Sequence, residues 1–376
     1  MFVRHRRSAL LLFTILAAPL VAHADPRYSI TPIGAAGSYP TGINNSGEVV
    51  GYFNPTAGVQ HAFLYTGSAF QDLGTLGGAG SRAAGINDAG VIVGASGTTG
   101  GATHAFRYAG GSMMDIGTLG GQNSSAEAIS NNGLIAGIAQ NTGGFSNAFV
   151  YTGSAMQSIG TLPLGESSRA YGINNAGAVT GDSRVGPVTF PEFQNHAFLY
   201  SGGSMTDLGN FGSSYSLGTS INDYGQVVGW SGYAQNANHA FLYSGTGMGM
   251  LDLGTFGGGV GSSIAYDINN GGQVVGYSDM PVSGNLEDRA FLYEGGGLID
   301  LNTLIDPASG WVLGYGIAIN DNQQIAAFGC NGALCQAVRL DLVSCVPEPE
   351  TNAMLLAGFG LLGWKSRGKL LARRAV

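Results

Sequence analysis

Short hydrophobic segments alternate with glycine-containing turns along most of the chain, in an order that recurs seven times. In each recurrence a segment ending in Ile runs into a four-residue turn, and an Ala-Phe segment or a degenerate copy of it follows. The turn reads Asn/Ser-x-x-Gly six times and a near-copy once. The isoleucines before the turns are Ile43, Ile86, Ile129, Ile173, Ile221, Ile268 and Ile319, spaced 43 to 51 residues apart. A repeat of this length is one supersecondary unit that must stack on copies of itself.

Each unit is expected to hold about four strands. In the second unit the apolar pattern predicts strands at 70–73, 83–87, 91–95 and 104–108. Asn87 and Gly90 take the first and last positions of the turn between the second and third of these, which is typical of a type I turn with a left-handed glycine. In the seventh unit Gln323 takes the glycine position, so we expect that hairpin to be strained or reshaped.

Four short antiparallel strands in 43 to 51 residues match the size of a β-propeller blade. A single sheet of this kind has two apolar faces, and packing the sheets radially in a closed ring buries both. The sequence therefore predicts an all-β fold, a seven-bladed β-propeller over residues 25–345. The alternative is an open β-solenoid, which is less favoured because its coils are normally about half this length.

The first 24 residues have the three parts of a secretory signal peptide. The basic start Arg4-His5-Arg6-Arg7 precedes an apolar run of 13 residues, and Ala22-His23-Ala24 forms a cleavage site. A retained transmembrane anchor is the alternative, but the apolar run is short for one. We expect signal peptidase to cut after Ala24.

Residues 346–376 form a second three-part signal. Val346-Pro347-Glu348-Pro349 precedes an apolar segment at 353–364, which is shorter than the roughly 20 residues of a membrane-spanning helix. The basic tail that follows consists of Lys365, Arg367, Lys369, Arg373 and Arg374. This order resembles the PEP-CTERM sorting signal of Gram-negative bacteria that make exopolysaccharide, although the basic tail is more spread out.

The PEP-CTERM resemblance implies transient membrane contact and cleavage by an exosortase near Val346-Pro347-Glu348-Pro349. It also implies a destination at the cell surface or outside the cell. A rigid Pro-x-Pro linker ahead of an ordinary C-terminal helix is the alternative interpretation.

The Ala-Phe segments share a triplet. His precedes Ala-Phe at His61, His104, His196 and His239, whereas Asn147 and Arg289 take this position in two further units. The phenylalanines are Phe63, Phe106, Phe149, Phe198, Phe241 and Phe291. With the turns between them, these triplets resemble the HAF repeat of bacterial extracellular proteins across nearly all of residues 28–342. The resemblance implies an extracellular location and no established activity.

The charge of the body narrows the possible partners. Residues 25–345 contain no Lys, seven Arg and 21 acidic residues, a net charge of −14. Such a surface repels phosphate backbones, so the sequence predicts no nucleic-acid partner.

The three cysteines lie near the C-terminus. Cys330 and Cys335 flank a loop that contains glycine, and an oxidising compartment favours a local disulfide between them. Cys345 remains as an odd thiol, which either pairs between chains or is simply a small apolar residue.

The repeated polar residues are expected to be structural, with no metal and no cofactor. The four histidines occupy the same place in different blades and therefore lie around a ring, where each makes one stabilising hydrogen bond. Asp88, Asp223 and Asp321 are explained by turn chemistry. Calcium stays open as an alternative for the aspartates that recur before Leu/Ile-Gly or Leu-Asn, which are Asp72, Asp115, Asp207, Asp252 and Asp300, although one Asp per blade does not supply clustered ligands.

No Gly-x-Ser-x-Gly, His-Glu-x-x-His or P-loop motif is present. The sequence therefore favours a non-catalytic binding, adhesion or matrix protein, with exopolysaccharide or other surface proteins as partners. The alternative is a glycan-processing enzyme whose carboxylates come from the longest inserts, 182–195 with Glu192 and 279–289 with Glu287 and Asp288. Both inserts are expected to be surface loops.

Overall fold

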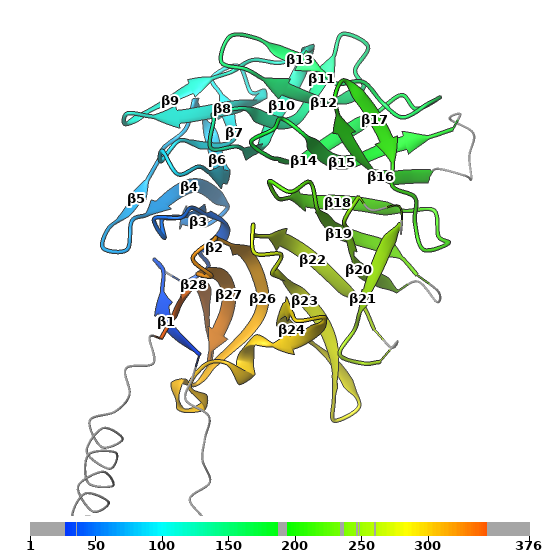
Figure 1. The fold of residues 1–376 in the computed structure, drawn as a ribbon. Helices are drawn as coiled ribbons and strands as arrows, with labels where there is room; N and C mark the ends of the chain where they lie inside the picture. The colour runs from blue at the N-terminus through cyan, green and yellow to red at the C-terminus, as the bar shows by residue number, and fades with distance from the viewer. Residues whose placement is uncertain are drawn as a thin grey trace, which may run out of the picture.

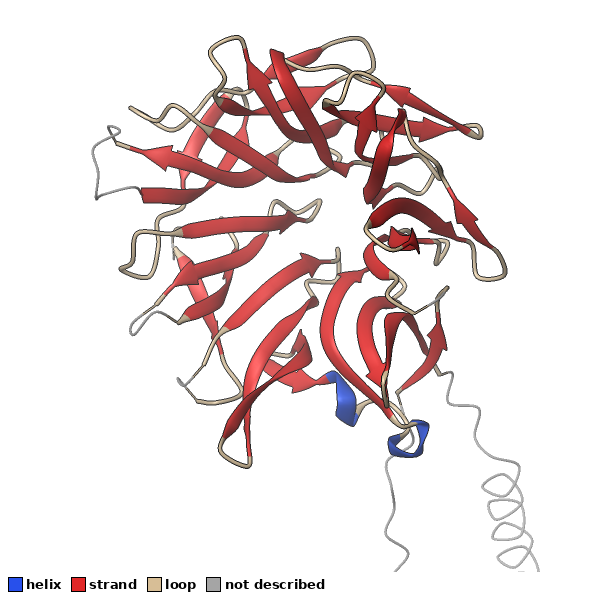
Figure 2. Ribbon diagram, turned by 180° about the vertical axis from the view of Figure 1, so that it is seen from behind, coloured by secondary structure: helices blue, strands red, loops and turns tan. Residues whose placement is uncertain are grey.

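The fold is a closed ring of seven four-stranded antiparallel sheets around a common axis (Figures 1 and 2). The computed structural model describes residues 27–34, 36–186, 194–233, 237–245, 247, 249–258 and 261–343. The predicted seven-bladed β-propeller is confirmed. Both sorting signals, with Ala22, Ala24 and the tail from Val346, lie outside the described residues, as does Cys345.

The four strands of each blade have the same order from the axis outward. The innermost strands are β2 (Tyr39–Ile43), β6 (Gly77–Ile86), β10 (Gly120–Ile129), β14 (Ser168–Ile173), β18 (Ser216–Ile221), β22 (Ser263–Ile268) and β26 (Trp311–Ile319). The second strands are β3 (Val49–Thr56), β7 (Ile92–Thr98), β11 (Ile135–Asn141), β15 (Val179–Val185), β19 (Val227–Gly232), β23 (Val274–Val282) and β27 (Ile325–Asn331). The third strands are β4 (Val59–Tyr65), β8 (Thr103–Ala109), β12 (Ser146–Tyr151), β16 (Gln194–Ser201), β20 (Asn238–Tyr243), β24 (Asn285–Glu294) and β28 (Leu334–Leu342). The outermost strands are β5 (Phe70–Asp72), β9 (Ser112–Asp115), β13 (Met156–Ser158), β17 (Ser204–Asp207), β21 (Met250–Gly254), β25 (Gly297–Asp300) and β1 (Tyr28–Pro32).

The predicted unit has the wrong phase. The segment at 70–73, expected to open the second unit, is β5, the outermost strand of blade 1, where Phe63 pairs with Asp72. Blade 2 consists of β6 to β9. A periodic pattern fixes the length of a unit but not its starting point, so the sequence alone did not show which strand comes first.

The ring is closed by strands from the two ends of the body. β1 pairs antiparallel with β28 and completes blade 7, so that Tyr28 lies opposite Leu342 (Figure 1). Two single-turn 3₁₀ helices, η2 (Leu301–Thr303) and η3 (Pro307–Ser309), connect blade 6 to blade 7. Because β1 comes from residues 28–32 and β28 from residues 334–342, blade 7 is complete only when both ends of the body are in place.

The Ala-Phe pair explains how the blades interlock. Neighbouring residues of a strand point to opposite faces of the sheet. Ala62 therefore packs in the cluster shared with blade 2, whereas Phe63 packs in the cluster shared with blade 7. Phe106 of blade 2 lies in the same cluster as Ala62, so a large side chain meets a small one across the interface. All six repeated phenylalanines are fully buried, which stabilises each interface by about 1.5–3 kcal/mol per ring.

The glycine in the second strand of six blades is required by a β-bulge, whereas Ala327 takes this position in blade 7. Each innermost strand has a register shift three residues before its turn, for example between Ala126 and Ala128. The bulge brings the carbonyl oxygen of Ser125 to the place where a Cβ at Gly137 would lie, 2.1 Å away. The same close approach, at 1.8–2.1 Å, occurs at Gly51, Gly94, Gly181, Gly229 and Gly276.

We expect Gly137→Ala to lower the free energy of unfolding by roughly 1–3 kcal/mol, as overpacked cores do. The new methyl group would meet a backbone carbonyl oxygen that is fixed by β10. The shift in the urea midpoint measures the effect. Gly100→Ala is the matched control, since the nearest atom to its Cβ is 3.9 Å away; equal midpoints for the two variants would contradict the bulge explanation.

Candidate functional site at the wide mouth of the central channel

Three cavities follow one another along the axis, and the one at the turn end is closed by hydrogen bonds. In each turn the backbone N–H of the second residue donates to the side-chain Oδ1 of the equivalent residue in the next blade, at 2.8–3.0 Å. The series runs Asn45, Asp88, Asn131, Asn175, Asp223, Asn270, Asp321 and back to Asn45. We call these seven residues the axial ring.

A second ring lies beside the axial ring. The amide of the first turn residue donates to the backbone carbonyl of the equivalent residue in the next blade, at 2.8–3.1 Å, in six of the seven turns. In blade 3 Ser130 takes that position, and the side chain of Asn132 donates across to Asn175 instead. The cavity at this narrow end has a volume of about 150 Å³. Its donors and acceptors are engaged with one another, so the narrow end holds the blades together.

With Gln323 in place of glycine, the seventh turn keeps the backbone conformation of the other six. Its φ of 62° lies in the left-handed region that glycine fills in the other six turns. The side chain accepts hydrogen bonds from Arg27 and Gln273, which hold the turn in place despite the strain. The expectation of a strained hairpin therefore agrees with the observed backbone.

The bulge turns one side chain of every innermost strand toward the channel. These residues are Thr41, Ala84, Glu127, Tyr171, Thr219, Tyr266 and Ile317, and all seven line the wider cavities. They differ from blade to blade, whereas the flanking residues of the turn and the core recur. The fold therefore requires the bulge but not the side chain that it presents, which leaves these positions free to form a site.

The opposite end of the channel opens into a wide mouth with a cavity of about 540 Å³. One side of the mouth carries charged groups. The Arg82 guanidinium lies 3.2 Å from the Glu127 carboxylate, and Arg169 binds the buried carboxylate of Asp182 through two nitrogens, at 3.0 and 2.8 Å. Burial raises the pKa of Asp182, although the hydrogen bonds from Arg169 and Asn195 act in the other direction.

The other side of the mouth carries aromatic rings from blades 6, 7 and 1. Their centroids are 5.0–6.5 Å apart along the series Tyr266, Tyr277, Tyr315, Phe328, Tyr39 and Tyr52. We call these six residues the aromatic rim. Burial raises the pKa of Tyr39 to about 12 and that of Tyr266 still further, so these phenols stay protonated and uncharged at neutral pH. Tyr315 donates a hydrogen bond to Asp288.

Asp267 lies deep in the channel wall, between the wide mouth and the axial ring. One carboxylate oxygen accepts from the Ser220 hydroxyl and the Ile268 N–H, and the other accepts from the Ile319 N–H, at 2.7–2.9 Å. Burial raises the pKa of this carboxyl to about 6 because these hydrogen bonds only partly compensate for lost hydration.

The repeated histidines each bind the aspartate at the end of the neighbouring outermost strand. Nδ1 lies 2.6–3.0 Å from Asp72, Asp115, Asp207 and Asp252, respectively. The same carboxylates accept from a backbone N–H two residues on. Burial alone would raise the pKa of Asp207, but hydrogen bonds from His196 and Gly209 outweigh it and leave the pKa below its usual value.

These pairs are spread around the ring, as the repeat predicts. Within the described residues, no three His, Cys, Asp or Glu side chains come together in a way that could hold a metal ion. The three blades without His also depart at the aspartate. Ser158 replaces it in blade 3, and in blade 6 Asp300 caps η2. In blade 7, where Gln336 takes the His position, Pro32 lies at the aspartate position opposite Val338.

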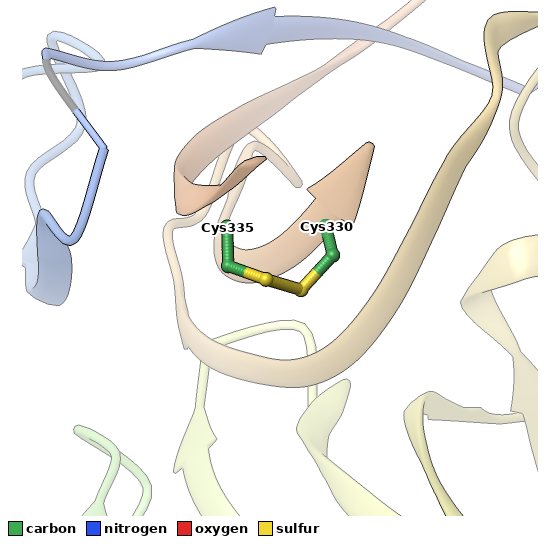
Figure 3. Close-up of a disulfide and its surroundings, with 2 residues drawn as sticks. All are labelled: Cys330 and Cys335. Carbon is green, nitrogen blue, oxygen red and sulfur yellow. A yellow bond between two sulfur atoms is a disulfide. The ribbon is translucent and has the colours of Figure 1, made fainter. Parts of the chain in front are cut away.

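Of the remaining predicted residues, Asp288 accepts a hydrogen bond from Tyr315 of the aromatic rim, and the others lie away from the mouth or outside the described chain. Cys330 and Cys335 form a disulfide between paired positions of β27 and β28 (Figure 3). The insert at 279–289 was expected to be a surface loop, and this prediction was wrong. β23 and β24 continue through the insert as a hairpin. Continued cross-strand pairing up to Ser283 and Gly284 replaces the expected loop. Glu192 lies outside the described residues.

Sequence reasoning missed the serines that join neighbouring blades. Each of these serines lies five residues before the isoleucine of a turn. Its hydroxyl accepts a hydrogen bond from the Ala N–H of the preceding blade and donates one to a carbonyl of the loop that leads into its own blade. Ser81, for example, accepts from Ala62 at 2.9 Å and donates to Gly74 at 2.5 Å. The others are Ser38, Ser124, Ser168, Ser216 and Ser263. Their fixed distance from the isoleucine was the available signal.

We expect Asp267 to make stability depend on pH. Since its pKa is raised to about 6 in the folded protein, above about 3.9 in an unfolded chain, its contribution is most favourable below pH 4. That contribution falls as the pH rises through 6, by roughly 3 kcal/mol in total. Asp267→Ala, which copies Ala128 and Ala318 of blades 3 and 7, removes this dependence. Urea midpoints between pH 4 and 7 measure it; parallel curves for the two proteins would refute it.

Comparison with known proteins identifies the sorting signal and supports the fold. Residues 346–374 match the PEP-CTERM protein-sorting motif. Residues 211–327 match a family described as protein of unknown function (DUF3466). No curated protein matches the sequence. The resemblance to the HAF repeat stays a prediction.

Several solved propellers are similar at low identity. The β-propeller domain of the Trilobed protease from Pyrococcus furiosus is 9% identical, with a TM-score of 0.50 over 84% of this chain and 98% of that one. A puromycin-hydrolyzing peptidase from Mycobacterium tuberculosis is 11% identical, with a TM-score of 0.50 over 88% of this chain and 55% of that one. The chain thus spans about half the length of that peptidase. A gluconolactonase from Xanthomonas campestris is 10% identical, with a TM-score of 0.40 over 84% and 90%.

The two structures with a TM-score of 0.50 support the fold alone. In the described part of the chain, no helix has the length and apolar character needed to cross a membrane. The chain carries a PEP-CTERM sorting motif, which implies recognition by an exosortase and export across the inner membrane to the cell surface or the extracellular space.

Proposed function

We propose that the chain is an exported, non-catalytic propeller that binds a carbohydrate at its wide mouth. The observation that carries this proposal is that Tyr39 and Tyr266 of the aromatic rim line one cavity together with the Arg82–Glu127 ion pair. The C–H faces of sugar rings stack on aromatic side chains, and sugar hydroxyls need donors and acceptors held at defined positions. Arg82, Glu127 and Tyr171 line the same mouth as Tyr39 and Tyr266.

The two ends of the channel differ in the polar groups that they offer to a ligand. At the narrow end, side-chain amides and carboxylates bind the next blade. At the wide mouth the side chain of Arg82 is 45% exposed although it contacts Glu127, so its remaining donors face solvent. The phenols of Tyr39 and Tyr266 are uncharged at neutral pH because burial raises their pKa, so they offer rings for stacking and hydroxyl groups for hydrogen bonds.

A glycan-processing enzyme is the alternative. It would need two carboxylates facing one substrate. Asp288 accepts a hydrogen bond from Tyr315, and Glu127 is held by Arg82 and by the Ser125 hydroxyl. These contacts orient both carboxylates and engage them within the protein, which favours binding over proton transfer. Incubation of a bound oligosaccharide with the protein, followed by mass analysis of the sugar, separates the two functions.

We expect Tyr266→Thr and Tyr315→Leu each to lower the affinity for the bound sugar about tenfold, or about 1.4 kcal/mol. Blades 1 and 5 have Thr41 and Thr219 at the position of Tyr266, and blade 5 has Leu217 at that of Tyr315, so both changes suit the fold. Binding is measured on an array of neutral and acidic oligosaccharides, then by calorimetry. Tyr224→Ala, which changes a tyrosine that is 77% exposed at the narrow end, is the control; loss of binding in this variant, or no binding by any variant or the parent, would contradict the proposal.

The sorting signals predict that the mature protein has lost both ends. Intact-mass analysis of the exported protein is expected to give a chain that begins at Asp25 and ends near Val346. An exported chain that still ends in Val376 would show that the tail is not processed.

A further inference from the structure

A second cavity continues outward from the wide mouth between blades 1 and 2. It has a volume of about 740 Å³ and is lined by the β3–β4 hairpin on one side and by β6, β7 and the β7–β8 turn on the other. Arg82 lines both this cavity and the wide mouth. We call the second cavity the blade 1–2 groove.

The groove exists because blade 2 has small residues where other blades have large ones. Ala95 follows the bulge-facing glycine of β7 and lies opposite Arg82 in the sheet. At the equivalent position the other blades have Tyr52, Ile138, Asp182, Trp230, Tyr277 and Phe328. Gly80 and Gly97 also line the groove, where blade 3 has Asn123 and Gln140.

The lining of the groove is uncharged apart from Arg82. Its side chains include Asn54, Gln60, Thr98 and Thr103, which offer amide and hydroxyl groups. Among the described residues that line it, none carries a carboxylate. A body with a net charge of −14 repels polyanions at longer range, so an uncharged ligand with many hydroxyl groups fits both the groove and its surroundings.

We propose that the groove extends the carbohydrate site, and that the ligand is an uncharged linear polysaccharide running from the aromatic rim across Arg82 into the groove. This inference rests on the proposed function. Each of the two cavities lies within the range of about 300–1,000 Å³ that holds a drug-sized ligand. Together they accommodate several linked sugar units, and Arg82 contacts the chain where it passes from one cavity to the other.

The test compares sugars of increasing length. The exported protein is titrated with cello-, xylo- and malto-oligosaccharides of two to six units. In the series that binds, affinity is expected to rise at least tenfold from two units to six. Ala95→Trp fills the groove and copies Trp230 of blade 5, so it should bind the disaccharide as the parent does but lose the gain with length. Met114→Trp, which places the same ring on the exposed edge of blade 2, should keep that gain.

A second variant covers the case in which Ala95→Trp does not fold. Asn54→Ala combined with Gln60→Ala removes two exposed hydrogen-bonding groups of the groove without adding volume, and it should also reduce the gain with length. Affinity that is independent of length in the parent, or a length dependence that both groove variants retain, overturns the groove while leaving the mouth intact. If none of these sugars binds the parent protein at any length, the inference about the groove is wrong. The proposed function is tested separately, by the oligosaccharide array that measures binding at the wide mouth.

Discussion

Every blade of this propeller has two apolar faces, and the rest of the structure follows from the need to cover both. A large Phe on one face and a small Ala on the other let each sheet fit its two neighbours in the same way around the ring. In an open row of blades, the first and the last would each leave one apolar face exposed. The last interface must therefore join the first blade to the seventh. β1 makes this possible by completing blade 7 from the N-terminal end of the body. Closure therefore depends on both ends of the body.

Hydrogen bonds between blades fix their relative positions, which apolar packing alone does not. Apolar contact brings blades together without fixing their relative height, whereas hydrogen bonds have a defined geometry. The axial ring, the neighbouring ring of amides and the six serines bind each blade to the next at fixed points. Because most of these bonds lie at the narrow end or along the interfaces, the wide mouth is not needed to hold the ring. A site can form there at little cost in stability.

The sequence predicted most of what repeats within a unit, although not the serines that join neighbouring blades. The number of blades, the strands, the turn glycines and the buried phenylalanines all follow from local patterns that recur. The phase of the unit was wrong because the outermost strand of one blade is followed directly by the innermost strand of the next. The axial ring was missed for a related reason: Asp88 and Asn131 are explained as turn residues by local rules alone, and only the closed ring brings them within 2.9 Å.

The candidate site could not be predicted from the repeat because its residues differ from one blade to the next. A search for motifs selects repeated residues, and in this chain repetition marks the scaffold: the His-Asp pairs, the serines and the bulge-facing glycines. The channel side chains vary from Thr41 to Glu127 to Tyr266 because the bulge presents them to the channel, although the hydroxyls of Thr41 and Thr219 also donate to a backbone carbonyl of the next blade. Changes at channel positions that lie far apart and share no partner should therefore add nearly independently. In a closed repeat, the positions that differ between units at one end of the axis are therefore the ones to examine first for ligand binding.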